Sequence, residues 1–105
     1  YREIGGKKDM AATYSNLGNV FGTREDLDKA EKMFRKALAL HEELDEKNGV
    51  AVLHCNLGVV FQARGDIVAA CRSWSKSRDM FAEIGAGGMV EKISDLMKNS
   101  GCPQD

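Results

Sequence analysis

The hydrophobic pattern of residues 10–23 is that of an amphipathic helix. Tyr14, Leu17, Gly18 and Phe21 are spaced i, i+3, i+4 and i+7, which places them together on one helical face toward a core. Similar spacing returns after each short polar turn, so the chain is expected to be all-α. The predicted helices cover about residues 10–23, 27–45, 50–63, 67–83 and 89–99.

One segment of the chain occurs twice. Residues 14–37, YSNLGNVFGTREDLDKAEKMFRKA, match residues 54–77, HCNLGVVFQARGDIVAACRSWSKS, without a gap, so residue 14 falls on residue 54 and the period is 40 residues. A period of this length is the mark of a helical solenoid or array. Glycine is unfavourable inside a helix, and its return at Gly18 and Gly58 predicts that a neighbouring helix backbone passes too close for a Cβ atom.

The repeated unit resembles the tetratricopeptide repeat. That pattern starts with aromatic-x-x-Leu-Gly-x-x-aromatic and continues with a small, an aromatic and a small residue in a second helix. His54 and Ser77 depart from it, and the usual proline near the end of the unit is absent. The matching places are Tyr14, Leu17, Gly18, Phe21, Ala30, Phe34 and Ala37, then His54, Leu57, Gly58, Phe61, Ala70, Trp74 and Ser77.

The unit is about six residues longer than the usual 34, which resembles the long-repeat type of kinesin light chains and Pins-like adaptors. The resemblance implies a right-handed α-solenoid of antiparallel helix pairs. Residues 1–4 align with the ends of second helices, and Gly5–Asp9 has the composition of a turn. Together with the missing initial Met, this indicates a piece of a longer array. The expected parts are 1–9, a stub of a preceding repeat with its turn; 10–49, repeat one; 50–88, repeat two; and 89–105, a capping helix and tail.

Net charge and cysteine content exclude some classes of partner and indicate a cellular location. The net charge is −1 at pH 7 with acids and bases mixed, so neither nucleic acid nor an anionic membrane is an expected partner. The chain has three cysteines, Cys55, Cys71 and Cys102, and no CxxC pair. An odd number without regular spacing favours reduced thiols and a cytoplasmic location, with Cys102 an exposed thiol of the tail.

The first helix of each repeat is uncharged, since no charged residue lies between Asp9 and Arg24 or between Lys47 and Arg64. In the family that the chain resembles, these helices line a concave groove for a partner peptide. The resemblance assigns the groove to Ala12, Ser15, Asn16, Asn19, Gly22 and Thr23, then Val52, Cys55, Asn56, Val59, Gln62 and Ala63. All of these except Gly22 and Ala63 are predicted partner-binding residues.

Asn16 and Asn56 are the sharpest candidates, because a carboxamide both donates and accepts hydrogen bonds. They either clamp the backbone of a partner or hydrogen-bond within the solenoid and steady the next repeat. His54 and Cys55 do not suggest a metal site, since adjacent helical residues point about 100° apart. No catalytic or cofactor signature occurs.

The expected function is a protein–protein interaction module that binds a peptide or helix and is not an enzyme. The alternative is a structural spacer that self-associates through the exposed face of its N-terminal repeat.

Overall fold

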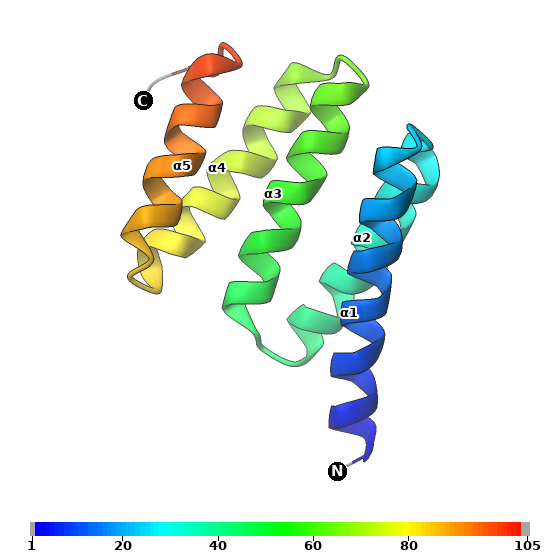
Figure 1. The fold of residues 1–105 in the computed structure, drawn as a ribbon. Coiled ribbons are helices and arrows are strands. Elements are labelled where there is room, and N and C mark those ends of the chain that lie inside the picture. The colour runs from blue at the N-terminus through cyan, green and yellow to red at the C-terminus, as the bar shows by residue number, and fades with distance from the viewer. Residues whose placement is uncertain (1, 104–105) are drawn as a thin grey trace.

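The computed structural model describes residues 2–103, with side chains from Gly5 onward. The described chain forms five helices and no strand, as expected (Figure 1). None of these helices, over the described residues, combines the length and apolar character needed to cross a bilayer. The helices are α1 (Arg2–Thr23), α2 (Leu27–Glu43), α3 (Lys47–Ala63), α4 (Ile67–Glu83) and α5 (Gly87–Asn99).

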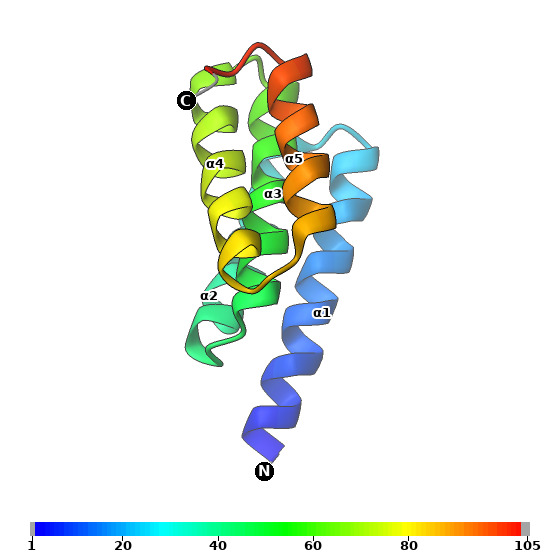
Figure 2. The ribbon, with the colours of Figure 1, turned by 90° about the vertical axis from the view of Figure 1, so that its left-hand side faces the viewer.

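The helices form two layers. α1, α3 and α5 lie side by side in one layer, and α2 and α4 lie behind them (Figures 1 and 2). Each helix packs on the next along the chain, and the result is a slab of 43 × 33 × 17 Å. The all-α helical repeat is therefore confirmed, while the right-handed superhelix stays a prediction.

Equally spaced turns set this arrangement. A residue with positive φ follows each of the first four helices: Glu25 at 62°, Asp45 at 54°, Gly65 at 84° and Gly85 at 76°. In each turn the next amide donates back to a carbonyl five residues earlier, as Asp26 does to Phe21 at 2.8 Å. These turn residues are 20 residues apart, so the 40-residue repeat divides into two equal helix-and-turn halves.

An aromatic ring against a glycine closes each helix pair. An ideal Cβ on Gly18 would lie 2.5 Å from Cε1 of Phe34, and one on Gly58 would lie 2.5 Å from Cδ1 of Trp74. The expectation of a close helix backbone was wrong in this detail, because what fills the space is the aromatic side chain of the partner helix. Trp74 is fully buried, and its Nε1 donates to the carbonyl of Cys55 at 3.2 Å.

The expected turn at Gly5–Asp9 was wrong, because α1 continues through it from Arg2. Residues 2–4 have no other helix of the described chain to pack against. Their backbone groups form hydrogen bonds by continuing α1. Lys7 and Lys8 also reach Glu43 and Glu46 with N–O distances of 3.2 and 3.7 Å. The stub of a preceding repeat is thus part of α1 as far as Arg2, and Tyr1 lies outside the described residues.

The outer face of α1 is apolar and exposed, which corrects the expectation that Leu17 faces the core. Leu17 is 38% exposed, between Met10 at 48% and Val20 at 43%. No helix of the described chain covers this face, whereas the same positions of α3 pack toward α2. Those equivalents are Val50, Leu57 and Val60, all of them buried, and Leu57 and Val60 belong to one hydrophobic cluster with residues of α2.

The expectation of three reduced thiols was wrong, because Cys71 of α4 and Cys102 form a disulfide with their Cα atoms 5.6 Å apart. Gly101 has φ of 85°, and the amide of Cys102 donates to the carbonyl of Met97 at 2.9 Å. This end of α5 turns the tail back onto α4 and buries Cys102. The cytoplasmic location was inferred from reduced thiols, so the disulfide removes that argument for it.

We predict that Gly58→Ala destabilises the fold by about 1–3 kcal/mol, because the hydrogen-bonded, fully buried Trp74 ring cannot make room for a methyl group. Urea unfolding followed by circular dichroism measures this. Gly22→Ala is the matched control, since its Cβ meets nothing within 4 Å and alanine favours the helix. Equal loss in both variants would contradict the packing argument.

We also predict that reducing the disulfide lowers the unfolding free energy by about 3 kcal/mol, because Cys71 and Cys102 are 31 residues apart and close a long loop. Urea unfolding with and without a phosphine reductant tests this. The Cys71→Ser/Cys102→Ser variant should not respond to the reductant, and a Cys55→Ala variant should respond like the parent chain. A parent chain that is indifferent to reductant would refute the prediction.

Candidate binding groove

A cavity of about 300 Å³ opens between α1 and α3, the first helices of the two repeats. It lies where these helices diverge above α2, because each packs on α2 more closely than on the other. None of the residues that line it is charged. They are Gly18, Asn19, Gly22, Thr23, Leu27, Phe34, Asn56, Val59, Val60 and Ala63.

The floor of the cavity is apolar and comes from the core. Phe34 is 4% exposed and packs on Gly18, so its ring fills the junction between α1 and α2. Leu27 and Val60 belong to the same hydrophobic cluster. The absence of a side chain at Gly18 thus both closes the helix pair and exposes part of an aromatic ring to the cavity.

Polar groups line the mouth of the cavity. Within the described chain the carboxamides of Asn19 and Asn56 make no hydrogen bond, and neither does that of Asn16. The hydroxyl of Thr23 donates to the carbonyl of Asn19 at 2.9 Å. Asn56 is half-buried and Asn19 is exposed, so both offer a donor and an acceptor to a ligand. Over residues 5–103 no hydrogen bond is present by which these side chains would steady the solenoid.

A network of ion pairs joins the C-terminal end of α3 to α2. Arg64, which follows α3, contacts Asp28 of α2 at 2.6 Å and also Glu31. Arg35 donates to Glu31 at 2.7 Å. Burial raises the pKa of Glu31, but the hydrogen bonds and charges of Arg35 and Arg64 outweigh it and hold that pKa below its usual value. Arg64 therefore links the two repeats.

Four of the ten predicted binding residues line the cavity, namely Asn19, Thr23, Asn56 and Val59. Ala12, Ser15 and Asn16 lie on α1 outside it, and Val52 lies on α3 outside it. These four, and the groove role of the whole set, stay predictions.

Two predicted residues of α3 face α5 instead. Cys55 packs against the core cluster shared by α3, α4 and α5, and burial raises the pKa of its thiol. Gln62 donates from Nε2 to Oγ of Ser100 at 2.9 Å. Sequence reasoning missed Leu27, Phe34 and Val60, which are core residues by pattern and become ligand-accessible only because α1 and α3 diverge.

The chain was compared with known proteins. Residues 9–85 match the tetratricopeptide repeat, so the match spans both repeated units and four of the five helices. The chain matches no curated protein. Among the residues that the structure describes, no group of three or more His, Cys, Asp or Glu side chains could hold a metal ion.

Proposed function

Because the chain belongs to the tetratricopeptide repeat family, whose members are in general non-catalytic interaction modules, we propose that it binds a partner protein through the groove between α1 and α3. The observation that carries the proposal is the pair of unpartnered carboxamides, Asn19 and Asn56, above an apolar floor. An extended peptide has both features that this groove complements: backbone groups for the carboxamides and a side chain for the cavity.

The uncharged residues that line the cavity favour an uncharged ligand side chain. With no charge at the cavity, an ionised side chain would lose water there without gaining a partner. The favoured peptide therefore inserts an aliphatic or aromatic side chain against Phe34 and Val60. Its backbone runs along Asn19 and Asn56. Two repeats present a short groove, so the interface is smaller than a standard one and the affinity is expected to be modest.

The test is selection of binding peptides from a displayed library of random short peptides on the intact chain. Binding of the selected peptide is then measured by titration calorimetry. Asn56→Asp removes the carboxamide donor and places a charge at the mouth of the cavity, so the dissociation constant should rise about ten-fold or more.

Asn48→Asp is the matched control, because it makes the same change on α3 at an exposed position far from the cavity lining. Asn16→Asp asks whether the groove extends along α1 as the family resemblance implies. A selected peptide that binds Asn56→Asp and the parent chain equally well would exclude the groove.

A second candidate function is self-association, which the exposed apolar face of α1 favours. Met10, Leu17 and Val20 lie on one helical stripe, and the equivalent stripe of α3 is buried against α2. A second copy of the chain that covers this face would make the module an architectural spacer. The two functions use different sides of α1 and can coexist.

Sedimentation equilibrium tests self-association. The mass should rise with concentration for the parent chain, and Leu17→Gln/Val20→Gln should stay monomeric because its stripe is polar. Val68→Gln is the control, since Val68 is 65% exposed on α4 and lies outside the stripe. A parent chain that is monomeric at all concentrations would reject the spacer.

A further inference from the structure

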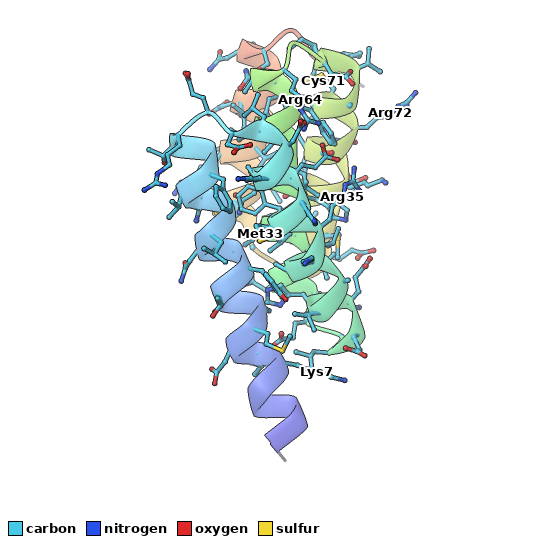
Figure 3. The ribbon with its side chains drawn as sticks, turned by 90° about the vertical axis from the view of Figure 1, so that its right-hand side faces the viewer. Lys7, Met33, Arg35, Arg64, Cys71 and Arg72 are labelled. Carbon is cyan, nitrogen blue, oxygen red and sulfur yellow. A yellow bond between two sulfur atoms is a disulfide. The ribbon has the colours of Figure 1, made fainter. Side chains whose placement is uncertain are left out.

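A second depression, of about 220 Å³, lies between α2 and α4 in the other layer of the molecule. Its cations are Arg35 of α2 with Arg72 and Lys76 of α4, and no acidic residue lines it. Figure 3 shows the labelled side chains of Arg35 and Arg72 projecting on the same side of the ribbon. Its apolar floor is formed by Leu38 of α2 and by Leu57 and Phe61 of α3.

The two cations that α4 contributes to the depression have no acidic partner within the described chain. Arg72 and Lys76 are exposed and make no ion pair, and their i, i+4 spacing places them on one face of α4. Asp28 and Glu31 of α2 are engaged by Arg64, and Glu42, the acid of α2 that acts on His54, does not line the depression. The depression therefore keeps a local positive charge although the whole chain carries −1.

Arg35, the third cation of the depression, differs from Arg72 and Lys76 because it has an acidic partner. Its Nε donates to Glu31 at 2.7 Å, and its guanidinium lies 6.0 Å from the centroid of the Phe61 ring. Glu31 thus holds Arg35 over the floor, with the remaining guanidinium donors directed to solvent or to a ligand. The guanidinium group is prepositioned before any ligand binds.

The first repeat has a different residue pair at the positions equivalent to His54 and Lys76. Lys36 lies over the Tyr14 ring, 5.3 Å from its centroid, and the equivalent pair forty residues later is Lys76 and His54. Burial and the charge of Lys76 lower the pKa of His54, while Glu42 opposes them. His54 is therefore neutral at neutral pH, and Lys76 lies near an imidazole where Lys36 lies over a phenol ring.

We propose that this depression binds a peptide of a partner protein in which an apolar side chain is flanked by carboxylates. Positive charges at the rim match the carboxylates, and the apolar floor matches the apolar side chain. An inorganic anion would leave the floor uncovered, and an apolar ligand would leave the cations unused. Exposed ion pairs are individually weak and screened by salt, so the affinity is low and falls as salt rises.

The site is separate from the groove between α1 and α3, since the two share no lining residue. A partner could therefore be held on both faces of the slab, by a neutral segment on one side and an acidic one on the other. Failure of either site leaves the other untouched.

The test is nuclear magnetic resonance titration of the ¹⁵N-labelled chain with the peptide acetyl-Glu-Glu-Leu-Glu-Glu-amide. Amide shifts should move around Phe61, Ser73 and Lys76 and stay constant around Asn19 and Val59. In Arg72→Gln/Lys76→Gln the dissociation constant should rise about five-fold or more, because two charge contacts are lost. Lys32→Gln/Lys98→Gln, with the same change in net charge outside the depression, should bind like the parent chain.

Three further arms decide the outcome. The analogue with Gln in place of every Glu should bind more weakly, and equal binding would overturn the role of the cations. The analogue with Ser in place of Leu should also bind more weakly, and equal binding would overturn the role of the floor. Inorganic phosphate that produces the same shifts at lower concentration than the peptide would assign a phosphate site and overturn the proposal, as would the absence of any peptide-induced shift.

Discussion

The contact of an aromatic ring with a glycine is the constraint on which both repeats depend. At Gly18 and Gly58 the ring of the second helix, Phe34 or Trp74, lies directly against the backbone of the first helix. The same contact shapes the candidate groove, because Phe34 also forms the floor of the cavity. Any side chain at Gly18 would therefore alter the packing of the pair and the ligand site at once. The packing, which is common to both repeats, explains why a residue so unfavourable in helices recurs at Gly58.

Charge is divided between the two layers of the slab. The helices α1 and α3 are uncharged over the segments that border the groove, and α2 and α4 carry more acids and bases than α1 and α3. Arg64 forms ion pairs with Asp28 and Glu31, and Arg72 has no ion pair with an acid in the described chain. The two proposed sites therefore differ in charge, the groove between α1 and α3 being neutral and the depression between α2 and α4 positive.

Local patterns were sufficient to predict the five helices except the start of α1, and also the repeat and its family, because apolar periodicity and the recurring Leu-Gly and aromatic places act within one helix pair. They were insufficient for features that join distant segments. The disulfide requires the left-handed Gly101 to turn Cys102 back to α4, and spacing alone contains no sign of that reversal. The cavity depends on how far α1 and α3 diverge, which no single-helix pattern encodes. Leu17 was misplaced because burial of its face requires another helix.

The disulfide also makes the two ends of the slab unequal. At the C-terminal end, α5 is linked covalently to α4, and Ser100 accepts a hydrogen bond from Gln62 of α3. At the other end, the first turns of α1 extend beyond its neighbours, where Lys7 and Lys8 form only solvent-exposed ion pairs (Figure 2). Amide hydrogen exchange should therefore follow a gradient, fastest in the first turns of α1 and slowest around Trp74. Fraying of α1 would begin beside its exposed stripe, so a partner on that stripe would bind and order the same segment.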